Sequence, residues 1–119
     1  MTPITISVGG SSFSVKLYDN DTTRALLAQF PLTLDMSEFN GREKFYHLPE
    51  NLPSTLTEKP ETIYAGEIML WSSNTLVLFY NTFPNSYDGY VRLGYVEDVT
   101  SLAAALGSGN LQVTFDVSD

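Results

Sequence analysis

The sequence predicts a mainly β fold, a closed or nearly closed eight-stranded β-barrel with two short helices. Three observations lead to this prediction. Short runs of alternating apolar and polar residues recur along the chain, glycine and asparagine turns separate them, and two segments show helical spacing. A barrel explains so many strands in 119 residues, because closing a sheet removes its exposed edges.

The strands are expected at residues 4–8, 13–17, 32–39, 42–48, 68–70, 76–80, 91–95 and 111–117. Gly9-Gly10 and Asn40-Gly41 are strong turn signals, so each predicts a hairpin between the strands on either side. In residues 32–39, one face is expected to carry Leu32, Leu34, Met36 and Phe39. The runs 68–70 and 76–80 are almost wholly apolar, which predicts strands buried on both faces or closed into a barrel.

The helices are expected after the second and the seventh strand. The first follows N-cap candidates in residues 19–22, puts Leu26, Leu27 and Phe30 on one stripe, and should end at Pro31. For the second, Asp98 or Thr100 is the expected cap, Leu102 and Leu106 should face the core, and Gly107 and Gly109 should stop the helix. The segments 49–62 and 81–89 remain as long surface loops.

Size and charge limit the partners. A chain of 119 residues, 43% of them apolar, is sized for a single domain spanning residues 1–119. Its net charge is -8 and its six Lys and Arg residues are scattered, which argues against nucleic acid and anionic membrane surfaces. No apolar run reaches the roughly 20 residues that span a bilayer. We expect a cytoplasmic protein, with an exported form whose signal segment has been removed as the alternative.

Three segments near the middle carry a family resemblance. GEIML at residues 66–70 is similar to a glycine-led Gly-x-Leu-x-Met strand, VLFY at residues 77–80 to a double-aromatic strand, and YVRLGYV at residues 90–96 to His-Val-Val-Phe-Gly-x-Val. Their order resembles the cyclophilin family. The match is closest to short bacterial proteins described as cyclophilin-like, which also share the TRALLAQF helix and a Glu-Lys-aromatic strand followed by Leu-Pro.

The resemblance implies the cyclophilin scaffold without the isomerase machinery of that family. Prolyl isomerisation there depends on an arginine, supported by a tryptophan and a histidine. Laying Phe45-Tyr46-His47-Leu48 on the family pattern puts His47 at the arginine position. Tyr90 then stands at the histidine position, and Asn85 or Ser86 at the tryptophan position. Because neutral imidazole lacks the forked, permanent charge of guanidinium, standard isomerase activity is not expected.

His47 is the one histidine and therefore the weak candidate for a catalytic residue. A catalytic imidazole needs a carboxylate to orient it. Glu43 shares its strand face but lies four residues away, so Glu50 or Glu67 would have to reach it across the fold. No metal site is expected, because the acidic run at residues 19–21 lacks the later residues of a calcium loop. No cofactor is expected either.

Aromatic residues crowd the middle of the chain beyond what a small core needs, which favours a ligand groove. We assign to this groove Phe45, Tyr46, His47, Glu67, Trp71, Phe79, Tyr80, Tyr87 and Tyr90. The leading hypothesis is a non-enzymatic module that binds a small molecule or a peptide. The alternatives are a prolyl isomerase with a non-standard active site, a hydrolase centred on His47, and a protein interaction domain whose exposed aromatics meet another protein. A homodimer is a further partner that we consider.

Overall fold

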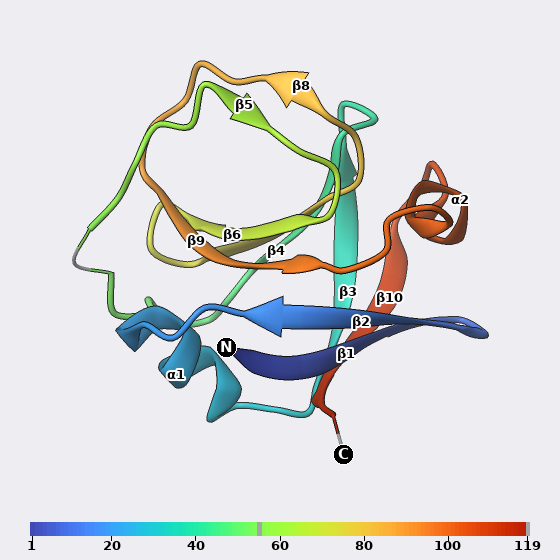
Figure 1. Cartoon of the computed structure of the whole chain (residues 1–119), viewed down its shortest axis with the longest axis horizontal. Coiled ribbons are helices and arrows are strands. Elements are labelled where there is room, and N and C mark those ends of the chain that lie inside the picture. Colours follow the sequence, from blue (N-terminus) through green and yellow to red (C-terminus); the bar gives the residue numbers. More distant parts are fainter. Residues whose placement is uncertain (55, 119) are drawn as a thin grey trace.

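A computed structural model describes residues 1–54 and 56–118 of the chain, and within them it shows a closed antiparallel barrel (Figure 1). The barrel strands follow one another around the wall in the order β1-β10-β3-β4-β7-β6-β9-β2. Their bounds are β1 Thr2–Val8, β2 Ser11–Leu17, β3 Leu32–Phe39, β4 Glu43–His47, β6 Glu67–Trp71, β7 Thr75–Phe79, β9 Tyr90–Val96 and β10 Leu111–Val117. The predicted eight-stranded barrel is confirmed, and β10 closes it by pairing with both β1 and β3.

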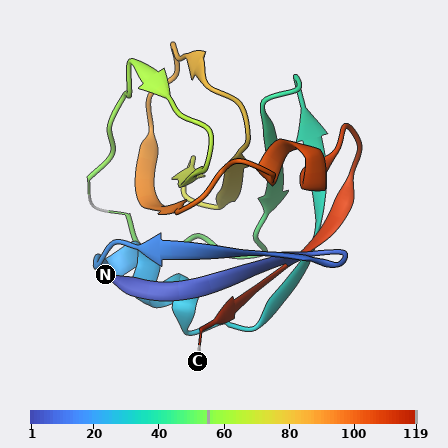
Figure 2. The same cartoon turned by 45° about the vertical axis from the view of Figure 1, so that its right-hand side comes forward.

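Two short helices lie on opposite sides of the barrel (Figures 1 and 2). Helix α1 covers Asp21–Leu27, and Asn20 caps it through a reciprocal capping box with Thr23. The helix ends before Pro31. After it, the N–H groups of Gln29 and Phe30 donate to the carbonyls of Leu26 and Leu27, only three positions earlier, so the chain tightens into a 3₁₀-type turn. The expected stripe is kept, with Leu26 buried and Leu27 and Phe30 packed against the core.

For helix α2, Leu102–Leu106, the prediction that Asp98 or Thr100 is the N-cap is wrong. Its N-cap is Ser101, whose side chain makes no capping hydrogen bond. Asp98 instead closes a local turn by accepting hydrogen bonds from the N–H and the hydroxyl of Thr100. The prediction that Leu102 and Leu106 face the core is confirmed, since both are buried.

Among the described residues, the barrel interior is a continuous apolar core with one charged side chain inside it. Lys44 on β4 is fully buried, and its ammonium group donates to Glu38 at 2.8 Å and to the carbonyls of Gly107 at 2.9 Å and Gly109. Hydrogen bonds from Lys44, the Tyr80 hydroxyl and the Gly41 N–H outweigh burial and hold the pKa of Glu38 below its usual value. Lys44 therefore ties β4 to the segment that follows α2.

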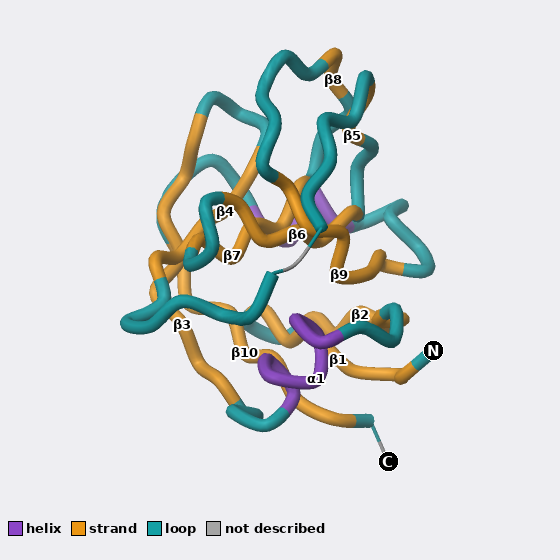
Figure 3. Tube along the Cα trace, turned by 90° about the vertical axis from the view of Figure 1, so that its left-hand side faces the viewer, coloured by secondary structure: helices purple, strands orange, loops and turns teal. Residues whose placement is uncertain are grey.

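A second apolar cluster lies outside the barrel, between β6, β7, β9 and a short pair of strands. The pair consists of β5, Thr62–Ile63, and β8, Phe83–Pro84. Figures 1 and 3 show it on the far side of β6 and β9 from β1 and β2. Met69, Val77 and Phe79 are buried here together with Ile63 and Phe83 of the pair. This second layer explains why β7 is buried on both faces, as the apolar run at residues 76–80 predicts.

Hydrogen bonds attach the two long loops, residues 49–62 and 81–89, to the barrel and to each other. Glu58 and Tyr90 exchange backbone hydrogen bonds, of 2.8 and 3.2 Å, which attaches the first loop to β9. Asn85 holds the second loop by donating to the carbonyls of Pro60, at 2.8 Å, and Tyr87, at 2.7 Å. In the part of the chain that the structure describes, neither helix approaches the length and apolarity that crossing a bilayer requires.

Candidate functional site

Strand register builds the candidate site on the outer face of β4, β7, β6 and β9. One row of aligned residues crosses all four strands, His47 to Thr75 to Trp71 to Tyr90. Side chains alternate between the two faces of a strand, so this row points away from the barrel interior. Two residues farther along β4 and β7, on the same outer face, Phe45 lies opposite Val77.

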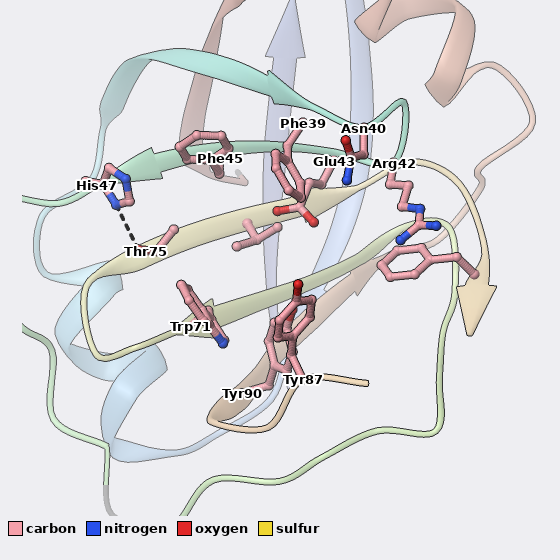
Figure 4. A pocket seen from close by; sticks show the side chains of 12 residues that line it. Phe39, Asn40, Arg42, Glu43, Phe45, His47, Trp71, Thr75, Tyr87 and Tyr90 are labelled. Carbon is pink, nitrogen blue, oxygen red and sulfur yellow. Dashed lines mark hydrogen bonds between the residues drawn. The ribbon is translucent and has the colours of Figure 1, made fainter. Parts of the chain in front are cut away.

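These rows surround a cavity of about 300 Å³. Its walls come from β4, β6, β7 and β9, from the β3–β4 turn, and from the loop after β8 (Figure 4). The lining residues are Phe39, Asn40, Arg42, Glu43, Phe45, His47, Trp71, Thr75, Val77, Phe83, Tyr87 and Tyr90. Most of the wall is aromatic, which is typical of sites for small or extended organic ligands. We refer to this space as the outer cavity.

Glu43 is the one carboxylate of the outer cavity, and its carboxyl group points into the space in Figure 4. Burial raises the pKa of Glu43 to about 7, the charge of Glu38 adds to this, and the Arg42 guanidinium only partly opposes it. In the part of the chain that the structure describes, no hydrogen bond to the Glu43 carboxylate lowers its pKa, in contrast to Glu38. Glu43 is therefore a desolvated acid facing open space.

The opposite wall consists of three aromatic rings. The Trp71 ring centroid lies 6.4 Å from that of Tyr87 and 6.5 Å from that of Tyr90. The Trp71 indole N–H donates to the carbonyl of Asp88 at 3.0 Å, which fixes the ring against the loop. Burial raises the pKa of Tyr90 to about 12, and the negative charge of Glu43 is the next cause. The phenol of Tyr90 is therefore neutral at physiological pH.

His47 lies at one end of the outer cavity. Its Nδ1 is 2.8 Å from the Thr75 hydroxyl, the hydrogen bond drawn in Figure 4. Its ring also packs on Phe45, with centroids 5.3 Å apart. Glu67, one of the carboxylates considered for His47, instead pairs with Arg92 and accepts from the Tyr64 N–H. Among the described residues, His47 thus has a hydroxyl partner and no orienting carboxylate.

The structure brings together part of the predicted groove. Phe45, His47, Trp71, Tyr87 and Tyr90 line the outer cavity. The other assigned residues do not: Tyr46 and Tyr80 face the barrel core, Phe79 lies buried beneath, and Glu67 is occupied by Arg92. The reason is alternation, because Tyr46 and Tyr80 are one position out of phase with the outward residues of β4 and β7.

Sequence reasoning missed Phe39, Asn40, Arg42, Glu43, Thr75, Val77 and Phe83 as lining residues. For Glu43 a signal was present, because it shares strand parity with Phe45 and His47. The prediction that Phe39 shares a face with Leu34 and Met36 is wrong, because Phe39 points outward and is 46% exposed while those two residues are buried. It contacts the edge of Phe45 at the β3–β4 turn, with ring centroids 6.4 Å apart. Asn85, which aligns with the tryptophan position of the cyclophilin family, instead stabilises its loop by donating to the carbonyls of Pro60 and Tyr87.

Metal binding receives no support from the described residues, which bring no three histidine or acidic side chains together. A second pocket, between β2 and the start of α2, is lined mainly by serines, with Phe13, Glu97 and Asp98. Phe13 is its one aromatic lining residue, and no buried side chain of the described residues lacks a hydrogen-bond partner there.

The closed barrel, its two helices and its outer-face cavity define a cyclophilin-like barrel protein. The chain belongs to the Cyclophilin-like family, whose family model matches residues 6–116. A search of curated proteins finds no match. Among solved structures, the chain resembles the solution structure of a hypothetical protein from Archaeoglobus fulgidus, with a TM-score of 0.72 and 14% sequence identity over 98% of this chain and 95% of the other. At that identity the likeness shows the fold alone.

Proposed function

We propose that the chain is a non-enzymatic binding module whose ligand, a small molecule or an extended peptide, occupies the outer cavity. The observation that carries the proposal is a preformed cavity whose aromatic walls remain accessible: Trp71 is 38% exposed and Tyr87 60% exposed. A side chain that only filled space would be covered, as Phe79 is beneath them. Half-exposed aromatic rings around a buried apolar floor are typical of ligand sites.

The rigid attachments of the walls support binding over a purely structural role. The Asp88 carbonyl holds Trp71, the Asn85 amide orders the loop that carries Tyr87, and Glu58 fixes the start of β9 at Tyr90. Walls held in place before a ligand arrives reduce the ordering cost of binding. The cavity is thus suited to a ligand without a large conformational change.

Nuclear magnetic resonance spectroscopy tests the proposal directly, because Trp71 is the single tryptophan and gives one indole N–H signal. Mixtures of small organic molecules and short extended peptides are added to the ¹⁵N-labelled protein. Binders should shift the indole signal and the amide signals of Phe45, His47 and Tyr90. Tyr87→Ala should weaken binding, whereas Tyr64→Ala, at an exposed tyrosine outside the cavity, should not. Binders that shift only other surfaces, or a Tyr64→Ala change as damaging as Tyr87→Ala, would overturn the proposal.

A second candidate function, prolyl isomerisation with a non-standard site, is favoured by Arg42. Its guanidinium lines the outer cavity and lies 4.5 Å from the centroid of the Phe83 ring. An arginine donor beside an aromatic wall could stabilise a twisted prolyl amide. It ranks second because Arg42 is an exposed residue that follows a turn. Isomerisation of a prolyl test peptide faster than the uncatalysed rate, lost in Arg42→Ala and kept in His47→Ala, would establish it, and an uncatalysed rate in the wild type would eliminate it.

A further inference from the structure

We infer that the outer cavity takes an alkylammonium compound, whose positive charge lies between the Glu43 carboxylate and the rings of Trp71, Tyr87 and Tyr90. This inference deepens the proposed function and rests on it. It names the chemistry of the ligand, which the aromatic lining alone does not determine.

The charge balance of the cavity gives the first argument. Glu43 brings a carboxylate to the cavity wall without a hydrogen bond to stabilise it. Lys44 points into the barrel toward Glu38, and Arg42, whose guanidinium lies on the Phe83 ring, only partly opposes the burial of Glu43. A charge out of water that is only partly compensated is costly, and a ligand cation would reduce that cost.

The aromatic wall gives the second argument. The faces of tryptophan and tyrosine rings attract cations within about 6 Å, and the attraction grows when the cation is shielded from water. Trp71, Tyr87 and Tyr90 stand together across the cavity from Glu43 (Figure 4). A carboxylate opposite a group of aromatic rings is the arrangement that recognises alkylated ammonium groups. A volume of about 300 Å³ is at the lower end for ligand pockets, which fits a small ammonium compound.

The whole chain has a charge that favours such a ligand. The net charge of -8 produces a negative field that concentrates cations near the surface and repels anions. An uncharged ligand gains nothing from this field, and it would cover Glu43 without supplying a partner. The carboxyl group would then have to be protonated, with the loss of its attraction for cations.

This protonation makes binding depend on pH. Arg42 beside Glu43 and the phenols of Tyr90 and Tyr87 line the same cavity, and His47 lies farther along β4. Glu38 of β3, which binds Lys44 on the barrel side, adds a like charge from that side. Burial raises the pKa of Glu43 to about 7, so the acid is largely neutral at pH 6 and charged at pH 8.5. A cation should therefore bind more tightly at pH 8.5, and its binding should release a proton.

Trp71 fluorescence can test the inference with two matched probes, choline and its uncharged isostere 3,3-dimethylbutan-1-ol. At pH 8.5 choline should bind the wild-type protein about tenfold more tightly than the isostere, and at pH 6 the preference should shrink. Glu43→Gln should reduce the preference severalfold at pH 8.5 and make what remains, which comes from the aromatic rings, independent of pH. The control Glu50→Gln, at an exposed carboxylate outside the cavity, should keep the wild-type preference. A peptide carrying trimethyllysine shows whether the ammonium group is preferred free or on a chain.

Three results would overturn the inference. The isostere could bind the wild type as tightly as choline, or Glu43→Gln could retain the full preference; the cavity would then bind ligands without recognising charge through Glu43, and the proposed function would stand. If neither probe changed the fluorescence at millimolar concentration, the ammonium assignment would fail. The nuclear magnetic resonance screen of small organic molecules and short extended peptides would still decide the proposed function separately.

Discussion

Lys44 and Glu43 are neighbours on β4, yet they face opposite sides of the barrel wall and differ in how their charges are satisfied. Lys44 has three acceptors and no exposure to solvent. Glu43 is desolvated, without a hydrogen bond, and faces a cavity. A buried charge with all its partners is typical of a structural role, and one without partners is the place to look for a ligand.

The apolar parts of the two regions show the same contrast. The interior core is closed by all eight barrel strands, and its rings and aliphatic side chains are covered. The outer cluster has an equally buried floor, with Met69 and Phe79 fully covered, but its walls at Trp71 and Tyr87 remain accessible. The apolar core inside the barrel is thus covered on all sides, whereas the outer apolar cluster is open to solvent at the outer cavity.

The largest effect is expected from breaking the interior charge pair. Lys44→Met keeps the apolar stem but removes the ammonium group, which leaves Glu38 and two carbonyls without their donor. The free energy of unfolding should fall by about 3–5 kcal/mol in urea denaturation. Lys16→Ala, which removes a surface ion pair to Glu97, should cost less than about 1 kcal/mol. Equal costs for the two variants would show that Lys44 is not the structural charge described above.

Glu43→Gln should raise the free energy of unfolding at alkaline pH, by less than Lys44→Met lowers it. The pKa of Glu43 rises from 4.5 in the unfolded chain to about 7 in the folded protein, so the contribution of this carboxyl group to stability is fully present below pH 4.5 and is lost as the pH rises through 7. At about 1.4 kcal/mol per pKa unit, the variant should be about 3 kcal/mol more stable than the wild type at pH 8.5.

At pH 4, where the wild-type carboxyl is protonated in both states, the advantage of Glu43→Gln should vanish. Thermal or urea unfolding at both pH values checks this, with Glu50→Gln as the surface control. A constant difference between Glu43→Gln and wild type over the whole range would contradict the desolvated carboxyl.

Gly94→Ala should destabilise the barrel by about 1–3 kcal/mol, because β9 serves both regions and must approach β2 closely. A Cβ at Gly94 would lie 2.2 Å from the Lys16 carbonyl oxygen and 2.9 Å from the Leu17 Cα. Gly10→Ala, in the first hairpin turn, meets no atom within 4 Å and is the matched control. Urea denaturation that ranked Gly10→Ala as the more harmful change would contradict the close β2–β9 contact.

His47→Ala should have the smallest effect, about 1 kcal/mol or less, because the imidazole is exposed and makes one hydrogen bond to Thr75. Choline binding should persist in this variant. A large loss of binding would move the charge-recognising group from Glu43 to the far end of the cavity.

The fold was predictable from the sequence because period-two runs, the turns at Gly9-Gly10 and Asn40-Gly41, and the order of the family-like segments all agree. The candidate site was predictable only in part. The crowding of aromatic residues indicates Trp71, Tyr87 and Tyr90, which do line the outer cavity, although Tyr90 is buried. The same crowding also indicates Tyr46 and Tyr80, which strand alternation turns toward the core. Glu43 and Lys44 are alike in the sequence as charged residues, and only register and loop placement show which one is enclosed.

The most direct test of the account is a ¹³C nuclear magnetic resonance titration of the Glu43 carboxyl group, assigned with Glu43→Gln, with and without choline. The account predicts a midpoint of about 7 in the free protein and a lower midpoint with choline present. A midpoint near the ordinary value of 4.5 that choline does not move would contradict it.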